Sequence, residues 1–203
     1  MESQKSCQIF RKGNVFIHEG SRPQGVYCIH AGKVKIYRHG DGRDQIIKVA
    51  GPGEILGYKA LLAEDVYPVS AEALEEVHVC FVPKSSFLET LFISSSFSQK
   101  ILRMACKELE VMTENITHMA QKSVRERTAA TLLLLHQTYG TDSAEEGSVY
   151  INMRREDIAS IVGTATETLI RLLADFKQEN LIETEGRKVI VRDVQQLKKV
   201  AGL

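Results

Sequence analysis

The segment from Met153 to Val191 constrains the fold more than any other part of this 203-residue chain. A first short helix is predicted by three apolar positions on one helical face, Ile158, Ile161 and Val162. Gly163 follows directly, and glycine accepts the positive φ that a tight turn between helices requires. The apolar face of a second helix is formed by Leu169, Leu172, Leu173 and Phe176. Two short helices joined by a glycine turn predict a helix-turn-helix, whose second helix normally enters the major groove of DNA.

The opposite face of the second helix carries side chains that suit base recognition. Arg171 can donate two hydrogen bonds to guanine O6 and N7, and Glu167 can accept one from the amino group of cytosine. The same residues also suit purely structural roles. Thr164 and Glu167 have the spacing of a capping box, with Thr164 as N-cap, and Glu167 and Arg171 form a favourable i, i+4 pair. These residues by themselves therefore leave both interpretations open.

Residues 161–182 resemble the helix-turn-helix of the Crp–Fnr superfamily of bacterial regulators. The Glu-Thr-x-x-Arg core of that family is present at Glu167, Thr168 and Arg171, and its turn glycine is Gly163. The resemblance implies that Glu167 and Arg171 contact base edges and that Arg155 holds a phosphate. Thr164 and Thr166 at the start of the second helix are, from their position alone, also suited to DNA contact. Thr166 replaces a base-contacting arginine of the cyclic-AMP receptor branch, so the chain is more similar to the Fnr-like side.

A charged hairpin follows the two helices. Residues 183–191 turn at Gly186, and Val189, Ile190 and Val191 supply a strand. Arg187 and Lys188 near the tip suit phosphate contact, as in the wing of a winged helix-turn-helix. A solvated charged turn would have the same composition. Phosphate contacts position a protein on DNA without selecting the sequence.

The charge balance argues against a nonspecific DNA coat. Residues 123–203 hold 11 Lys and Arg against 12 Asp and Glu. Nonspecific binding requires a broad positive field, whereas a sequence-specific dimer can manage with a few placed arginines and helix N-termini.

Compartment and cofactor signals point to a cytoplasmic protein without a bound group. No run of about 18 apolar residues is present, and the N-terminus lacks the apolar core of a signal peptide. The single cysteines Cys7, Cys28, Cys80 and Cys106 include no Cys-x-x-Cys pair, which disfavours a zinc ribbon. An iron–sulfur cluster requires several thiolates, so we expect no metal and no cofactor.

The sequence pattern of residues 9–92 is typical of an antiparallel barrel or jelly roll. Short β-rich runs alternate with glycine turns, and the runs are Val15–His18, Gly25–His30, Val34–Arg38, Asp44–Val49, Ser70–Leu74 and Val77–Pro83. The stretch from Tyr27 to Tyr37, followed by Gly-Pro-Gly-Glu-Ile-Leu-Gly, resembles the cyclic-nucleotide-binding-like β-roll. The Crp–Fnr superfamily carries that domain ahead of its helix-turn-helix.

The effector pocket that this resemblance implies is degenerate, and it comprises Gly57, Tyr58, Lys59 and Tyr67. Cyclic-AMP binders have a glutamate where Tyr58 stands and an Arg-Ser pair near the position of Tyr67 and Pro68. No arginine lies between Arg43 and Arg103. Since a buried phosphate without a cationic partner is costly, we expect that cyclic AMP does not control this protein.

A long helix is predicted between the two domains. Its apolar positions follow an a/d seam over about three heptads, at Leu102, Ala105, Leu109, Met112, Ile116 and Met119. A helix packed on its own domain would explain one heptad, whereas three favour a two-helix coil. The superfamily dimerises through the matching helix.

The sequence therefore predicts an α+β chain with a β-roll over residues 1–93, a dimerisation helix over 94–122 and a winged helix-turn-helix over 123–203. We expect a homodimeric transcription regulator whose partners are double-stranded DNA and RNA polymerase, with no membrane association. The alternative is a cyclic-nucleotide-type sensor or protein-interaction module that does not recognise DNA. No catalytic motif is present, so we do not expect an enzyme.

Overall fold

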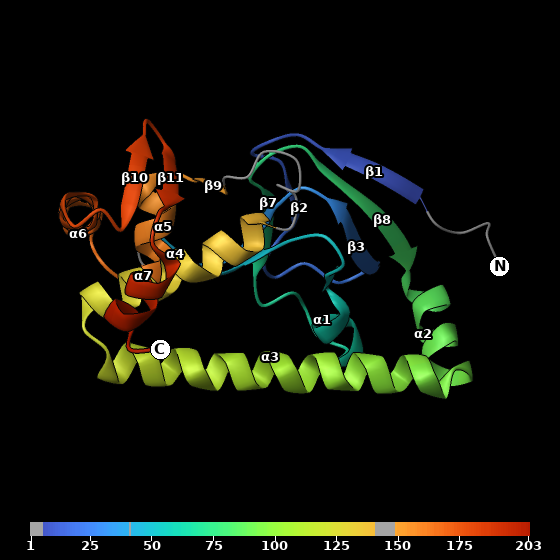
Figure 1. The fold of residues 1–203 in the computed structure, drawn as a ribbon. Coiled ribbons are helices and arrows are strands. Elements are labelled where there is room, and N and C mark those ends of the chain that lie inside the picture. The colour runs from blue at the N-terminus through green and yellow to red at the C-terminus, as the bar shows by residue number, and fades with distance from the viewer. Residues whose placement is uncertain (1–5, 41, 141–148) are drawn as a thin grey trace. The chain divides into compact units, whose positions relative to one another are not determined.

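A computed structural model describes residues 6–40, 42–140 and 149–203 (Figure 1). The chain divides into two compact units, Met1–Glu114 and Asn115–Leu203. The division falls within one long helix, α3 (Ser95–Gln121). The domain limits given by the sequence analysis stay a prediction.

The first unit is a β-roll of two antiparallel four-stranded sheets, with strand orders β1-β8-β3-β6 and β2-β7-β4-β5. The strands are β1 (Ser6–Phe10), β2 (Val15–Ile17), β3 (Gly25–Ala31), β4 (Val34–His39), β5 (Asp44–Ala50), β6 (Ile55–Leu56), β7 (Ser70–Ala73) and β8 (Val77–Pro83). Side chains from both sheets meet in one core, among them Ile29 and Val79 from one sheet and Ile17, Val34 and Ala71 from the other. This confirms the predicted antiparallel β-roll.

Three helices complete the first unit: α1 (Tyr58–Leu62), α2 (Lys84–Ile93) and most of α3. They enclose a second apolar cluster formed by Val26, Tyr58, Leu61, Phe87 and Ile101. The edge-to-face contact between Phe87 and Phe97 fastens α2 to α3, with ring centroids 5.7 Å apart. The start of α3 is therefore part of the core of the first unit.

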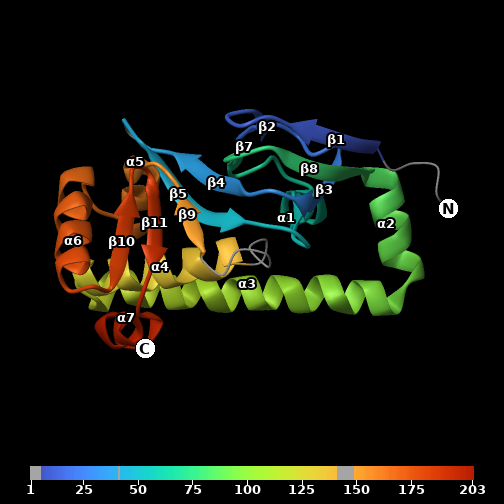
Figure 2. The ribbon, with the colours of Figure 1, turned by 45° about the horizontal axis from the view of Figure 1, so that its top comes forward.

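The second unit contains four further helices and a three-stranded antiparallel sheet of order β10-β11-β9. Its elements are α4 (Val124–Gly140), β9 (Tyr150–Asn152), α5 (Arg155–Val162), α6 (Thr166–Gln178), β10 (Ile182–Glu185), β11 (Lys188–Val191) and α7 (Val194–Ala201). α7 starts at a side-chain cap, because Asp193 accepts a hydrogen bond from the Gln196 amide at 2.8 Å. Figures 1 and 2 show α6 beside the hairpin of β10 and β11. No helix in the described part of the chain is long and apolar enough to span a membrane.

Candidate DNA interface and effector pocket

The helix-turn-helix consists of α5 and α6, each with one buried apolar side. Ile158 and Val162 are buried in α5, and Leu169, Leu173 and Phe176 are buried in α6. The predicted core positions Ile161 and Leu172 are only half-buried. Since the apolar back of α6 is held in the domain, the orientation of its opposite face is set by the core.

Gly163 closes α5 in the left-handed conformation, with φ 72° and ψ 50°. Its amide donates to the Ser160 carbonyl at 3.2 Å, and the Thr164 amide donates to the Ala159 carbonyl at 3.1 Å. This is the Schellman pattern of helix termination, and it confirms the predicted glycine turn. A Cβ at this position would also lie 2.5 Å from the Cε atom of Met119, which would have to move, so the positive φ is the main reason for glycine here.

The predicted capping role of Thr164 is wrong. α6 starts at Thr166, its N-cap is Ala165, and no side chain caps it. The amide of Thr164 instead belongs to the termination of α5. Thr164 therefore lies in the turn, and Glu167 stands in the first turn of α6 without a capping-box partner.

The outward face of α6 carries Glu167, Ile170 and Arg171, and Ile170 is 51% exposed. The side chains of Thr166 and Thr168 are half-buried beside them. Within the described part of the chain, neither Glu167 nor Arg171 makes an intramolecular hydrogen bond or ion pair. The i, i+4 pair considered as a structural explanation is thus not formed there, and both charged groups are available to an outside partner.

Arg155 supports the turn of the β10–β11 hairpin. Its guanidinium donates to the backbone carbonyl of Arg187 at 3.0 Å and to that of Gly186 at 3.1 Å. Burial lowers the pKa of Arg155 from its ordinary value. The side chain thereby ties the first residue of α5 to the hairpin tip, a contact that the sequence analysis did not foresee.

The hairpin presents the other two predicted phosphate contacts. Arg187 and Lys188 are exposed at the turn around Gly186. The ammonium of Lys188 lies 4.8 Å from the ring centroid of Tyr150 on β9, a cation–π contact that restrains its direction. The structure therefore brings Arg155, Arg187 and Lys188 to one end of the small sheet.

Two arginines on α4 were missed by sequence reasoning. Arg127 donates to the carbonyls of Lys122, Val162 and Gly163, at 2.8, 3.1 and 3.4 Å. Arg125 forms a forked pair with Glu179 at 2.6 and 2.7 Å and lies over the ring of Phe176. These side chains hold the turn between α5 and α6, and the residue that follows α6, against α4. No local sequence signal marks them, because their partners in and next to the helix-turn-helix lie some 35 to 54 residues away.

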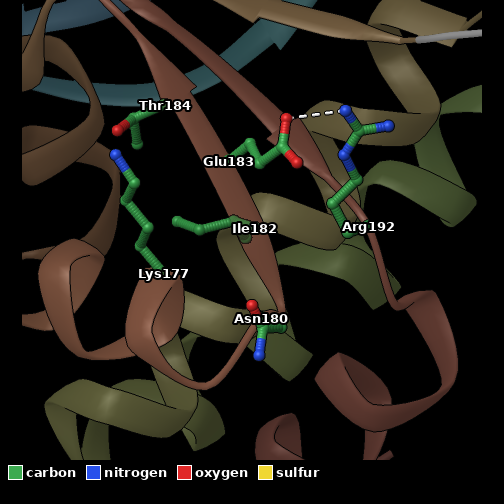
Figure 3. A pocket seen from close by; sticks show the side chains of 6 residues that line it. All are labelled: Lys177, Asn180, Ile182, Glu183, Thr184 and Arg192. Atoms are coloured by element: carbon green, nitrogen blue, oxygen red, sulfur yellow. Dashed lines mark hydrogen bonds and ion pairs between the residues drawn. The ribbon is translucent and has the colours of Figure 1, made fainter.

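A polar hollow of about 490 Å³ lies between the end of α6 and the outer side of β10, and its lining residues are Lys177, Asn180, Ile182, Glu183, Thr184 and Arg192 (Figure 3). Arg192 and Glu183 form an ion pair at 2.6 Å across it. Lys177 points toward Thr184 in the same view. The ion pair neutralises Arg192, and Lys177 is the remaining cation among these lining residues.

The residues of the predicted degenerate effector pocket make contacts with one another and with their neighbours. Tyr58 is only 1% exposed and belongs to the second apolar cluster. Its hydroxyl donates to Oε2 of Glu108 on α3 at 3.0 Å, and burial raises its pKa above the ordinary tyrosine value. Lys59 forms an ion pair with the same carboxylate oxygen at 2.9 Å. Both side chains are thus engaged within the unit.

The ring of Tyr67 lies beside Gly57, the residue that precedes Tyr58. Tyr67 is buried, its hydroxyl donates to the carbonyl of Gly25 at 3.3 Å, and burial raises its pKa to about 12. Gly57 has φ 88°, and a Cβ there would lie 3.1 Å from the Tyr67 ring. The glycine of the pocket motif is therefore packed against an aromatic ring.

Glu108 is the centre of this polar cluster and was not identified from the sequence. Lys48 approaches its Oε1 atom at 3.4 Å, in addition to the contacts from Tyr58 and Lys59. Burial alone would raise the pKa of Glu108, but the hydrogen bond and charge of Lys59, with Lys48 and Tyr58, outweigh it and lower the pKa. The carboxylate of Glu108 is therefore charged at neutral pH and forms ion pairs with both Lys48 and Lys59.

The predicted seam on α3 is mainly exposed. Ile116 is 71% exposed, and the other exposed seam residues are Leu102, Leu109, Met112 and Met119. Ala105 differs, because it packs against the second apolar cluster of the first unit. Exposing a row of large apolar side chains along one helix to water is costly.

Nothing in the described residues assembles a metal centre: no group of three or more His, Cys, Asp or Glu side chains is placed to hold an ion.

Two domain families match the chain in order. The cyclic nucleotide-binding domain matches residues 7–94, and the Crp-like helix-turn-helix domain matches residues 126–200. The first family covers the β-roll, and the second covers the unit that contains α5 and α6.

Full-length relatives share this arrangement. The CRP-like cAMP-activated global transcriptional regulator of Mycobacterium tuberculosis is 28% identical over 193 residues, which cover 95% of this chain and 86% of the relative. The transcriptional activator protein Anr of Pseudomonas protegens is 28% identical, with coverage of 95% and 79%. The structure of FixK2 from Bradyrhizobium japonicum has a TM-score of 0.83 at 25% identity, with coverage of 97% and 96%.

Proposed function

Because this chain belongs to the Crp/Fnr superfamily of transcription regulators, with a cyclic nucleotide-binding domain ahead of a Crp-like helix-turn-helix, we propose that it binds near-palindromic double-stranded DNA as a homodimer. In this proposal α6 of each protomer enters the major groove of one half-site. The half-sites lie about one helical turn, or roughly 34 Å, apart.

The observation that carries this proposal is the charged face of α6. Arg171 and Glu167 are exposed on it, and neither makes an internal contact within the described residues. When these two side chains bind DNA they lose rotamer freedom, but they do not have to break an existing side-chain contact. Arg171 is assigned to a guanine, and Glu167 to a cytosine amino group.

Phosphate contacts are assigned to Arg155, Arg187 and Lys188. Arg155 uses two of its five N–H donors on the hairpin turn, so it can still donate to a phosphate while it positions the other two residues. Thr164 lies in the turn before α6, and Thr166 and Thr168 lie in the first turn of α6, where backbone amides and the helix dipole favour an anion. These contacts fix the register of α6 on the duplex.

The homodimer is assigned to the exposed seam of α3. Two copies of the seam would bury Leu102, Leu109, Met112, Ile116 and Met119 against their equivalents. Ala105 contributes less than predicted, because it already packs in the first unit. Dimerisation links two weak half-site contacts into one stronger event.

The proposed action, partners and compartment follow from membership of the Crp/Fnr superfamily. The relatives are regulators rather than enzymes, and the proposed action is regulation of transcription through DNA and RNA polymerase in the cytoplasm. The burial of Tyr58 and Tyr67 in the predicted pocket supports regulation that does not use cyclic AMP.

The DNA assignment is tested by Arg171→Ala. Loss of a forked contact to guanine should cost about 1–3 kcal/mol and relax discrimination at one base pair in each half-site. Selection of bound sequences from random DNA, followed by titration of the selected sites, measures both effects. An unchanged selected motif would show that Arg171 does not contact a base.

Arg155→Ala serves as the matched contrast. Because a phosphate contact carries no sequence information, this variant should weaken all sites alike and reduce the slope of affinity against salt by about one unit. Lys177→Ala, outside the proposed interface, should leave affinity and motif unchanged. A base-specific loss in Arg155→Ala would contradict the phosphate assignment.

A further inference from the structure

Three cysteines from three neighbouring strands lie in one row across the sheet β1-β8-β3-β6. Cys80 on β8 is directly opposite Cys7 on β1 and also directly opposite Cys28 on β3. Directly opposite residues of antiparallel strands project from the same face of the sheet. The fold therefore gathers onto one face three thiols that are scattered singly along the sequence.

This row faces away from the core of the roll. Val77 and Val79 of β8 belong to that core, and successive side chains of a strand alternate between faces, so Cys80 projects from the opposite face. Cys7 is exposed, and Cys28 and Cys80 are partly exposed. A small solute therefore has access to the row, which a cysteine buried in the core would not allow.

The geometry of one pair suits a disulfide bond. The Sγ atoms of Cys7 and Cys80 lie 3.6 Å apart. Directly opposite Cα atoms of antiparallel strands are separated by about 4.5 or 5.5 Å, and both separations lie within the range of about 4.4–6.8 Å that a disulfide spans. Side-chain rotation and a small adjustment of β1 are enough to bring the sulfurs into bonding contact. β1 is an edge strand and pairs only with β8, so it can make that adjustment.

We propose that Cys7 and Cys80 are a redox-active dithiol that hydrogen peroxide converts into a cross-strand disulfide. The Cys7 sulfur, as thiolate, attacks one peroxide oxygen; the O–O bond breaks, and the leaving hydroxide takes up a proton to become water. The Cys80 sulfur then attacks the sulfur of the Cys7 sulfenic acid. An S–S bond forms as the S–O bond breaks, and the hydroxyl leaves with the Cys80 proton as a second water. Two thiols are oxidised and one peroxide is reduced to two waters.

The bond would fasten the edge strand covalently. In the reduced protein β1 is held by its ladder to β8 and by the stacking of Phe10 on Phe16, without a covalent link. β8 runs directly into α2 at Lys84. Oxidation thus links the N-terminal strand to the strand that leads into the helical part of the first unit. Cys28, on the other side of Cys80, lies on a strand paired on both sides by β8 and β6 and has less freedom to adjust.

The test uses the full chain, reduced with dithiothreitol and then treated with hydrogen peroxide after removal of the reductant. Remaining thiols are blocked with iodoacetamide, and intact mass and peptide mapping are recorded. We expect two carbamidomethyl groups where the reduced protein takes up four, a mass two hydrogen atoms lower once these groups are subtracted, a peptide pair that joins Cys7 to Cys80, and full reversal by dithiothreitol. Unlinked, alkylated Cys7 and Cys80 after treatment would overturn the proposal.

Single variants separate this pair from the other thiols. Cys7→Ser and Cys80→Ser should each abolish the intramolecular link, whereas Cys28→Ser and Cys106→Ser should retain it. Cys7 is exposed, so its replacement leaves the packing of the roll intact and circular dichroism checks this. A link that persists in Cys7→Ser, or that joins Cys80 to Cys28 in the wild-type protein, would contradict the assignment.

Discussion

Ile116→Glu is expected to convert the homodimer into monomers and to lower affinity for a two-half-site operator by about 100-fold or more. Ile116 is the most exposed residue of the α3 seam. In a dimer, the variant would place two carboxylates opposite each other in a poorly solvated interface, where desolvation and repulsion both oppose association. Each monomer would then bind one half-site without the effective concentration that the dimer supplies.

Sedimentation measures the oligomeric state, and titration with intact and single-half-site DNA measures the loss of linkage. Val111→Glu is the matched control. It adds the same charge to the same exposed helix, at a c position outside the a/d seam, and should remain dimeric with unchanged affinity. Both variants should keep the circular dichroism of the wild-type protein. An Ile116→Glu protein that sediments as a dimer would show that the interface lies elsewhere.

The helix-turn-helix could be predicted because its determinants are local. The apolar positions Ile158, Val162 and Leu169 and the turn at Gly163 lie within twelve residues, and their spacing specifies two helices and a tight turn. The error at Thr164 has an equally local cause. A threonine three residues before a glutamate matches a capping box, but the Schellman closure of α5 engages the Thr164 amide and delays the start of α6 to Thr166.

Six strands of the β-roll were predicted from the sequence, but the short elements at its margins were missed. β6 has two residues, too few to show any alternation, and β1 combines polar and apolar residues at an edge. α1 is a single turn of five residues. Such elements form because neighbouring strands and helices supply their partners, so local propensity does not reveal them.

The polar contacts of Arg127 and Glu108 could not be predicted from the sequence, for a different reason. Arg127 acts on carbonyls 35 residues away, and Glu108 meets Tyr58 across 50 residues. Neither residue belongs to a motif, and each acquires its role only when the chain has folded. Sequence reasoning predicted that Tyr58 and Tyr67 are unsuited to cyclic AMP, but it did not identify Glu108, which contacts Tyr58 and Lys59.

Cyclic AMP and cyclic GMP are expected not to bind measurably at about 100 μM. The cyclic phosphate carries a full charge, and its usual partner in the superfamily is a guanidinium that makes a forked contact. Here Tyr67 is buried with its hydroxyl on the Gly25 carbonyl, and Pro68 has no N–H to donate. Loss of the guanidinium should weaken binding roughly 30- to several-thousand-fold.

The structure adds two reasons to the chemical one. The nearby cation, Lys59, is already paired with Glu108 at 2.9 Å, so a phosphate would have to displace a carboxylate to reach it. The ring of Tyr58 is packed in the second apolar cluster and cannot withdraw without exposing that cluster to water. Calorimetry with the full chain decides the matter, with the cAMP-activated regulator of Mycobacterium tuberculosis as the positive control. Saturable binding of one nucleotide per subunit would contradict the expectation, and Lys59→Ala would then establish whether that lysine holds the phosphate.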